Sequence, residues 1–294
     1  MSEGLIYKVL AGTYFISLDG AHIQAKAAGR FRKEKLEPKV GDRVILRPPQ
    51  GEGSFWLIEN INERKNELLR PPVANIDRLV IVLSPVYPAP DLSLADLLIS
   101  YCRHFEIKPV ICINKMDMDK QGAQALKEQY DSCGIDAVCV SAHKGQGIDR
   151  LRSLLGRGVN CFAGQSAVGK SSLLNCLIAG GRLKTGGLSR KTDRGRHTTR
   201  QCELMEYEPD CFFIDTPGFS LLEQMLMPPE DFTALYYEFD KYAPFCRFRG
   251  CSHVNEPGCA VKEAVAKGEL SLQRYERYKN LYKITEENWR KRYD

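Results

Sequence analysis

A glycine-rich stretch of eight residues has the types and spacing needed to bind phosphate. It runs from Gly164 to Ser171 and matches G-x-x-x-x-G-K-S. Its glycines let the backbone wrap a phosphate chain with the N–H groups pointing inward. Lys170 can reach the β- and γ-phosphates, and Ser171 can offer its hydroxyl to Mg²⁺. The remaining predicted phosphate contacts are Gln165, Ser166, Ala167, Val168, Gly169 and Ser172. A chance turn is disfavoured, because an apolar run precedes the stretch and helical spacing follows it.

A second motif, N-K-x-D, comprises Asn114, Lys115 and Asp117 and indicates guanine recognition. A carboxylate at the edge of guanine accepts bonds from N1–H and the 2-amino group, whereas adenine would leave it unpaired. Asn114 can hold the ring from the other side and tie loops together. Ser141 and Ala142 follow a later predicted strand, where a backbone N–H could meet the guanine carbonyl. Each of these signals is weak alone, since N-K-x-D also occurs in solvated turns.

A third motif, D-x-x-G, comprises Asp215 and Gly218 and suits magnesium and γ-phosphate. Asp215 can hold Mg²⁺ through water, and the Gly218 N–H could touch the γ-phosphate. The basic stretch 182–200 lies between this motif and the phosphate loop. It contains Thr198 and Thr199, either of which could ligate Mg²⁺, and we favour Thr199. The alternative for such a charged stretch is a solvated loop that binds nothing.

A cysteine and histidine cluster near the C-terminus has the spacing of a metal site. Its residues are Cys246, Cys251, His253 and Cys259. Three thiolates and one imidazole suit tetrahedral zinc and leave no open position, so we predict one structural Zn²⁺ per chain. The loop is too short to form a core, and metal binding would supply its folding energy. Disulfides or unpaired surface thiols are the alternative.

The first 70 residues precede all of these motifs and are predicted to form a separate domain. Five short strands are expected at residues 5–10, 13–18, 21–27, 40–46 and 55–61, with a hairpin turn at Asp19-Gly20. Five strands in this length indicate an OB-type β-barrel. Basic residues gather around its middle, which suits nucleic acid or a basic surface that binds nothing. They are Lys26, Arg30, Arg32, Lys33, Lys35, Lys39 and Arg43.

Residues 71–225 change to alternating strands and helices, which predicts a parallel, doubly wound α/β sheet. Strands are expected at 77–83, 108–113, 137–140, 159–163, 201–207 and 211–214, and helices at 92–105, 124–133 and 151–155. The third part, 226–294, carries the cysteine cluster and helices at 260–267 and 270–283. Tyr275, Tyr278, Leu281 and Tyr282 are expected to pack there, and the tail 288–294 suits stacking on RNA.

Composition describes an ordinary soluble chain of 294 residues with a net charge of +5. The sequence has no apolar run of 18 residues and no secretory signal at its start, so we predict a cytoplasmic protein without a membrane partner. The eight cysteines outside the cluster are expected to be small buried hydrophobes.

The three nucleotide motifs occur in rotated order, with N-K-x-D before the phosphate loop. A circular permutation keeps their contacts while moving the chain ends. With the barrel and the cysteine cluster, the chain resembles the bacterial ribosome small-subunit-dependent GTPase A family over nearly its whole length. The resemblance implies GTP hydrolysis with Mg²⁺, stimulated by the 30S subunit during its late maturation, with 16S rRNA and GTP or GDP as partners and a monomeric chain.

The same resemblance assigns a role to His197. Phe219 follows Gly218 where many GTPases carry a glutamine that orients water, and an apolar side chain cannot do this. A first-switch histidine is the family's candidate for that role, and the matching residue is His197. His197 could instead contact RNA or solvent. Two other functions stay open: an RNA-binding assembly factor with guanine nucleotide as a structural ligand, and an ATP-using enzyme, which Asp117 disfavours.

Overall fold

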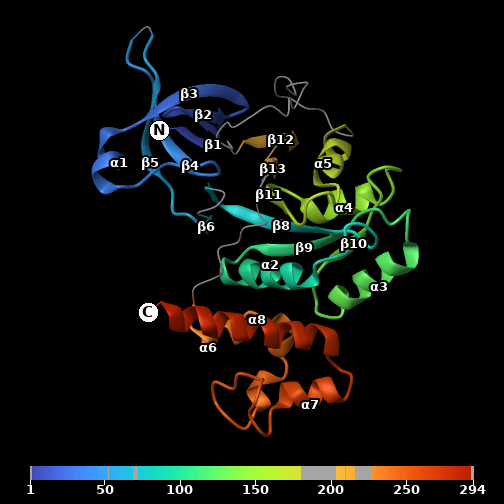
Figure 1. Ribbon diagram of the computed structural model, residues 1–294. Helices are drawn as coiled ribbons and strands as arrows, with labels where there is room; N and C mark the ends of the chain where they lie inside the picture. Colours follow the sequence, from blue (N-terminus) through green and yellow to red (C-terminus); the bar gives the residue numbers. More distant parts are fainter. Residues whose placement is uncertain are drawn as a thin grey trace. The chain divides into compact units, whose positions relative to one another are not determined.

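The computed structural model describes residues 2–51, 53–68, 72–179, 203–208, 210–215 and 227–292 (Figure 1). The chain divides into two compact units. The first unit comprises Met1–Leu79, Leu155–Ala163 and Lys170–Phe219, and the second comprises Val80–Leu154, Gly164–Gly169 and Ser220–Asp294. Within the described ranges, no helix combines the length and apolar character needed to cross a membrane.

The first unit begins with a closed five-stranded barrel, which confirms the OB-type prediction. Its strands are β1 (Ser2–Leu10), β2 (Thr13–Leu18), β3 (Ala21–Ala27), β4 (Arg43–Arg47) and β5 (Trp56–Ile61), in the order β1-β2-β3-β5-β4. Only the described pairing of β3 with β5 is parallel. Alternate side chains point inward, and Ile16, Val44 and Ile58 have no exposed surface.

Two local features of the barrel differ from the expected pattern. A short helix, α1 (Gly29–Glu34), was missed, and its only buried residue, Phe31, packs into the barrel core. Strand β4 begins at Arg43 rather than at residue 40, because Gly41 turns the backbone at φ +91°. A side chain at Gly41 would place its Cβ 2.0 Å from the Ala74 carbonyl oxygen, so this turn requires glycine.

A six-stranded sheet carries the nucleotide motifs. Its strands are β8 (Ile76–Leu83), β9 (Lys108–Ile113), β10 (Ala137–Cys139), β11 (Gly158–Ala163), β12 (Leu204–Glu208) and β13 (Cys211–Asp215). In the first unit, β11 pairs with β13 in parallel, and the Val159 N–H donates to Asp77 of β8. In the second unit, β10 pairs with β9, and the Asn114 N–H donates to Leu83 of β8. Strand β8 runs through both units, giving the order β10-β9-β8-β11-β13-β12.

This sheet confirms the predicted α/β class. Strand β12 is antiparallel to β13 and forms a hairpin with it. Two shorter strands, β6 (Glu67–Leu68) and β7 (Val73–Ala74), pair with each other outside the sheet. The helices that follow the strands are α2 (Leu92–His104), α3 (Lys120–Asp131), α4 (Ile148–Leu155) and α5 (Lys170–Ala179). Helix α3 begins four residues before the expected start, because the Asp119 side chain caps it by accepting from the Gly122 N–H.

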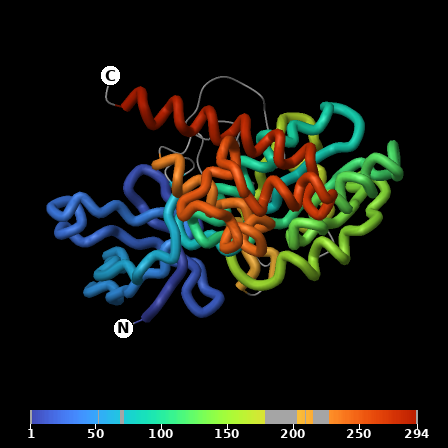
Figure 2. The backbone as a smooth tube through the Cα atoms, turned by 90° about the horizontal axis from the view of Figure 1, so that it is seen from below, coloured from blue at the N-terminus to red at the C-terminus, as the bar shows by residue number. Residues whose placement is uncertain are grey.

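The C-terminal part is helical and has an aromatic core. Its elements are α6 (Pro229–Thr233), η1 (Tyr237–Phe239), η2 (Ala243–Phe245), α7 (Ala260–Ala266) and α8 (Leu272–Lys291). In Figure 2, α7 and the preceding loop, in orange, lie against α8, in red. Phe232, Tyr236 and Tyr278 pack in the core between them. The described tyrosines of α8 therefore have the packing role that was expected of them.

Helix α8 extends well past the expected end at residue 283. The interval to Lys291 contains neither glycine nor proline, and Glu286 pairs with Arg290 one turn later at 3.0 Å. The Thr285 hydroxyl also donates to the Leu281 carbonyl at 2.9 Å. The predicted RNA-stacking tail is thus helical up to Lys291, and residues 293–294 lie outside the described range.

Candidate functional site

The phosphate loop of the second unit depends on glycine at both of its ends. Gly164 has φ +134° and Gly169 has φ +96°, conformations that other residues rarely adopt. A Cβ on Gly164 would lie 2.3 Å from the Val82 carbonyl oxygen. A Cβ on Gly169 would lie 2.4 Å from the Asn114 side-chain nitrogen. The loop thus passes close to the ends of β8 and β9, which only a bare backbone allows.

Asn114 joins the loop of the N-K-x-D motif, residues 114–117, to the phosphate loop. We call residues 114–117 the guanine loop after their predicted role. Its buried side-chain amide donates from Nδ2 to the Val168 carbonyl at 2.9 Å. Its Oδ1 accepts from the Ala142 N–H at 3.0 Å. The amide has one further N–H, which is the group available for a nucleotide ring. A guanine carbonyl at the Ala142 N–H would share that donor with Asn114. The expected tie between loops is therefore present.

Lys115 adds a second link between the same two loops. Its backbone has φ +64°, which turns the chain sharply after β9. Its ammonium donates to the Ala167 carbonyl at 2.8 Å and to the Tyr87 carbonyl at 2.6 Å. Two fixed acceptors hold the aliphatic part of this side chain between the loops, where it can form a platform for a flat ring.

Asp117 is partly exposed and its carboxylate is ionised. A hydrogen bond from the Ser141 side chain is the main reason that the pKa of Asp117 is lowered, and nearby Lys144 and His143 add to it. Ser141 itself is buried and its hydroxyl also accepts from the Lys144 N–H at 3.1 Å. An ionised carboxylate is the form that accepts two bonds from guanine.

A contact that was not anticipated involves Gln165 of the phosphate loop. Its side-chain oxygen accepts from the Asp91 N–H at 3.0 Å. Asp91 is the cap of α2, and its own carboxylate accepts from the Leu94 N–H at 2.9 Å. The phosphate loop is thereby attached to the first turn of α2. The proline-rich segment before Asp91 marks a rigid turn in the sequence, but nothing in it reveals the partner of Gln165.

The magnesium residues are described only in part. In the first unit, Asp215 is the last residue of β13, and its backbone is in register with Phe162 of β11, just before the phosphate loop. Lys170 and Ser171 open α5, and Ser172 is exposed there. Gly218, His197, Thr198 and Thr199 lie outside the described residues.

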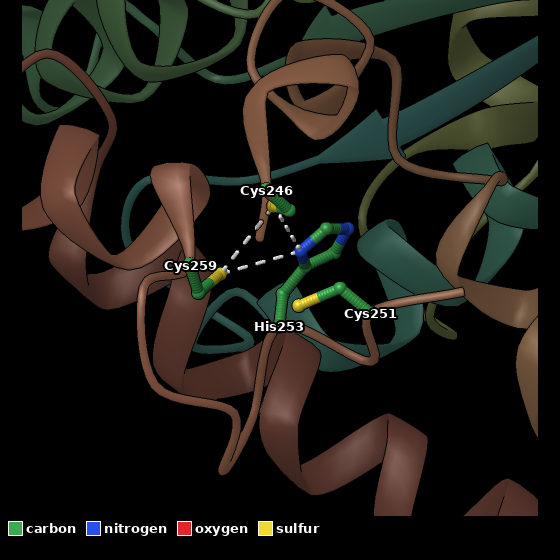
Figure 3. Close-up of side chains that lie close together, drawn as sticks. All are labelled: Cys246, Cys251, His253 and Cys259. Carbon is green, nitrogen blue, oxygen red and sulfur yellow. Dashed lines mark hydrogen bonds between the residues drawn. The ribbon is translucent and has the colours of Figure 1, made fainter. Parts of the chain in front are cut away.

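The cysteine cluster has the dimensions of a tetrahedral metal site (Figure 3). Zinc–sulfur bonds of about 2.3 Å and zinc–nitrogen bonds of about 2.0 Å put sulfurs about 3.8 Å apart and nitrogen about 3.5 Å from sulfur. Cys246 Sγ lies 3.9 Å from Cys259 Sγ. His253 Nδ1 lies 3.6 Å from Cys246 Sγ and 3.4 Å from Cys259 Sγ. With Cys251, all four ligand atoms lie within 4.8 Å of one another.

The surroundings of the cluster are compatible with a bound cation. Burial raises the pKa of the Cys251 thiol to about 12, so without a cation it stays protonated. Burial also lowers the pKa of His253, which favours the neutral imidazole that ligates metals. The Tyr275 hydroxyl donates to the His253 carbonyl at 2.7 Å, and the Tyr278 hydroxyl donates to the Ser252 carbonyl. These residues hold the loop in the shape that a zinc ion requires.

Two family models match this chain. Residues 3–54 match the RsgA N-terminal domain, and residues 61–225 match the RsgA GTPase. A small ribosomal subunit biogenesis GTPase RsgA from Caldanaerobacter subterraneus is 40% identical over 292 residues, covering 99% of this chain and 98% of that protein. The protein of the same name from Agathobacter rectalis is 38% identical, covering 95% and 96%.

Two solved structures share the fold. YjeQ from Thermotoga maritima has a TM-score of 0.83 at 32% identity, covering 97% of this chain and 98% of that one. YloQ, described as a circularly permuted GTPase, has a TM-score of 0.80 at 33% identity, covering 98% and 96%. The rotated motif order thus occurs in a chain of known structure with the same architecture.

Proposed function

The chain belongs to the RsgA GTPase family, and we propose that it hydrolyses GTP to GDP and phosphate while bound to the small ribosomal subunit during late maturation. Its relatives are named for small-subunit biogenesis, which supports this partner. The proposal includes contact with 16S rRNA, a cytoplasmic location and a monomeric chain. The GTPase activity itself follows from the family.

The observation that carries the proposal is the pair of hydrogen bonds made by Asn114. Through them the guanine loop, the phosphate loop and the Ala142 loop form a single group in the second unit. A nucleotide with its base at Asp117 and its phosphates along Gly164–Gly169 would touch all three loops at once. Guanine selection then follows from the ionised Asp117, since adenine cannot satisfy that carboxylate.

Hydrolysis of GTP needs positioning and charge stabilisation more than covalent chemistry. In the proposed site, the backbone N–H groups from Gly164 to Gly169 and the ammonium of Lys170 hold the phosphates. Ser171, Asp215 and Thr199 would hold Mg²⁺, which supplies charge neutralisation between the β- and γ-phosphates when bound. The Gly218 N–H would donate a hydrogen bond to the γ-phosphate. The zinc residues have a structural role, because their four ligands leave no coordination position for a substrate.

We assign the role of orienting the attacking water to His197. Phe219 occupies the place where a glutamine would orient water, and its side chain has no polar atom. A histidine next to the attacking water can orient that water or accept its proton. Replacement of His197 with alanine is expected to lower kcat by 10²- to 10⁴-fold with little change in nucleotide affinity. Loss of affinity for GTP with unchanged kcat would instead place His197 in binding.

Nucleotide-dependent sedimentation with purified ribosomal subunits tests the whole proposal. The zinc-loaded chain should pellet with 30S subunits in the presence of a non-hydrolysable GTP analogue and release them with GDP. Phosphate release from GTP should rise when 30S subunits are added, and 50S subunits serve as the control. Equal sedimentation with both nucleotides would refute control of 30S binding by the bound nucleotide.

One alternative retains support from a specific residue. Phe219 in place of glutamine is what a weak or inactive hydrolase would carry, so the chain could be an RNA-binding assembly factor with guanine nucleotide as a structural ligand. Intact binding of GTP and 30S subunits without stimulated phosphate release would favour that function. Competition between ATP and GTP separates both from an ATP-using enzyme.

A further inference from the structure

A cluster of four charged side chains lies where α8 packs on α2; Arg274 and Asp96 are buried, and Glu238 and Arg277 are partly exposed. Arg274 of α8 is 1% exposed, and its guanidinium contacts the carboxylates of Asp96 on α2 and Glu238 on η1. Arg277 Nε lies 2.6 Å from the second oxygen of Asp96. Burial alone lowers the pKa of Arg274, but the facing carboxylates raise it well above its ordinary value. Two positive and two negative charges thus compensate one another, and the Arg274–Asp96 pair among them is shielded from water.

Such a cluster contributes little to stability compared with apolar packing. Taking Arg274 and Asp96 out of water carries a large desolvation cost that their attraction to the other charges only roughly repays. Its geometry, in contrast, is strict, because each carboxylate oxygen has a fixed partner. A buried cluster of this kind therefore specifies how α2 and α8 sit against each other. In Figure 1, α2 lies between β9 and α8, and both neighbours contact it.

The α2 side of the cluster leads to the phosphate loop. Asp96 lies in the second turn of the helix that Asp91 caps. The Asp91 N–H donates to Gln165, so the start of α2 follows the position of the phosphate loop. The connection from Gln165 to Asp96 runs through one and a half helical turns, which are stiff.

The α3 side leads to the guanine loop. Tyr130 of α3 is buried and its hydroxyl lies 3.4 Å from Asp96 Oδ1. The Arg274 guanidinium carbon lies 5.7 Å from the centre of the Tyr130 ring. Helix α3 begins shortly after Asp117, at the Asp119 cap. The loop with Asp117 therefore continues into a helix that contacts Arg274, and the phosphate loop is hydrogen-bonded to the first turn of a second such helix, α2.

On the other side, α8 leads within one turn to residues 246–259, which we call the zinc loop after the predicted metal. Tyr275 follows Arg274 directly, and its hydroxyl donates to the carbonyl of the ligand residue His253 at 2.7 Å. Tyr278, one turn further, donates to the neighbouring Ser252 carbonyl. A shift of α8 that follows Arg274 would be passed to two backbone groups of the zinc loop. A surface hollow of about 480 Å³ beside the first turn of α8, lined by Pro85, Leu126 and Ser271 among others, leaves room for such a shift.

We propose that Arg274 is a positioning residue, which couples occupancy of the nucleotide loops to the conformation of the zinc loop through Asp96, Tyr130 and Tyr275. The proposal rests on the function proposed above, since it needs guanine nucleotide in those loops. The coupling is reciprocal: whatever fixes the zinc loop also changes nucleotide affinity by the same factor.

The test is hydrogen–deuterium exchange of residues 246–259 in the zinc-loaded full chain, measured without nucleotide, with GDP and with a non-hydrolysable GTP analogue. The wild type should show at least about a 5-fold difference in exchange between two of these states. The double variant Arg274→Met with Asp96→Asn removes one charge of each sign and keeps the cluster neutral. It should reduce the difference to less than about 2-fold while zinc content and GTP affinity stay near wild type. The matched control Arg290→Gln, on an exposed pair of the same helix, should retain the full difference.

Activity supplies a readout that a merely structural role would not move. In the double variant, 30S-stimulated kcat should fall while KM for GTP stays within about 3-fold of wild type. The single variant Arg274→Lys keeps the charge but not the planar guanidinium. It should therefore retain part of the exchange difference that the double variant loses. If the double variant fails to retain zinc, Arg277→Met, at the edge of the cluster, replaces it in the same measurements.

Two results would overturn the coupling: a zinc loop whose exchange does not respond to nucleotide in the wild type, or a response that survives loss of the cluster. A wild type that fails to bind guanine nucleotide would refute the proposed function instead. Direct titration with a fluorescent GTP analogue separates the two cases.

Discussion

Asn114 shows how one side chain can organise a site without touching the reaction. Its amide supplies a donor to Val168 and an acceptor to the Ala142 N–H, and it is almost fully buried. Removing it would take a donor from the buried Val168 carbonyl, and a buried carbonyl without a partner costs more than the bond itself contributes. A residue that reads the base, by contrast, must stay open to the nucleotide, and Asp117, which we propose for this role, is partly exposed.

Replacing Asp117 with asparagine should change which base is accepted. Asparagine offers a donor that suits the 2-oxo group of xanthine and cannot accept from both guanine donors. We expect GTP affinity to fall by on the order of 10²- to 10⁴-fold and XTP affinity to rise. Titrations with fluorescent GTP and XTP analogues measure both changes. Retained GTP preference would remove Asp117 from the base site.

Gly169→Ala should disturb the phosphate loop and Asn114 together. The new methyl group would approach the Asn114 amide nitrogen to 2.4 Å, and φ is +96° at this position. We expect a loss of about 1–3 kcal/mol in unfolding free energy and weaker nucleotide binding. Thermal unfolding and GTP titration check this prediction.

Gly145→Ala is its matched control. Gly145 also has positive φ, at +67°, but nothing lies within 4 Å of a Cβ built on it. It should cost about 1 kcal/mol and leave GTP affinity unchanged, because only backbone strain is added. Equal nucleotide affinity in both variants would show that the close approach to Asn114 does not matter.

At the scale of elements, the zinc loop and α7 depend on their ligands. Cys251→Ser should release the metal and unfold this segment, since structural Zn²⁺ contributes on the order of 10 kcal/mol of folding free energy in zinc-finger peptides. Trypsin should then cut after Arg247 and Arg249, and zinc content should fall to zero. The control Cys139→Ser, at a half-buried cysteine outside the cluster, should keep both the metal and the resistance to trypsin.

The β6–β7 hairpin should make a small contribution to stability that depends on pH. A hydrogen bond from Lys39 is the main reason that the pKa of Glu67 is lowered. Burial acts in the opposite direction, and a hydrogen bond from Arg64 lowers the pKa further. A lowered folded-state pKa gives stability that is complete above the unfolded value of about 4.3 and is lost as the pH falls below it. Because Glu67 is partly exposed, we expect less than about 1 kcal/mol. Urea unfolding of wild type and Glu67→Gln should differ at pH 6 and converge at pH 3; an unchanged difference would contradict this.

The strands of the barrel and the sheet could be predicted from the sequence, because their signal is local. The turn at Asp19-Gly20 and the apolar runs fix β2, β3, β8 and β9 to within a residue or two. Helix α1 was missed because it has a single buried side chain, Phe31, and so no period to detect. The cysteine and histidine cluster carries its own spacing in the sequence, and the structure brings its four possible ligand atoms within 4.8 Å of one another.

The contacts between distant segments could not be predicted in this way. Arg274 and Asp96 are 178 residues apart, and a charged pair at that separation leaves no pattern in the sequence. The same holds for Gln165 and Asp91, whose bond depends on how the proline-rich segment turns. Such contacts appear only once the sheet brings the loops together.

At the scale of the whole molecule, the basic residues of the barrel divide into two groups. Lys39 pairs with Glu67, and Arg43 lies 3.6 Å from Glu3, so their charges are partly used within the protein. Arg32, Lys33 and Lys35 are exposed on α1 and its C-terminal cap. These three are therefore the residues best placed to meet a phosphate backbone, and Lys35 and Arg32 also border a surface hollow of about 620 Å³.

Replacing these three residues with glutamine should weaken 30S binding in a salt-dependent manner. Each phosphate contact releases counterions and adds roughly 0.7–0.9 to the slope of log affinity against log salt concentration. Three lost contacts should lower that slope by about 2–3, with the largest loss of affinity at low salt. The matched control replaces Lys108, Lys120 and Arg150, which are exposed outside the barrel. It leaves the net charge equal to that of the test variant, so it separates a local contact from general attraction. An equal loss in both variants would mean that the barrel attracts RNA only through overall charge, and an unchanged slope in the first would place the rRNA contact on another surface of the chain.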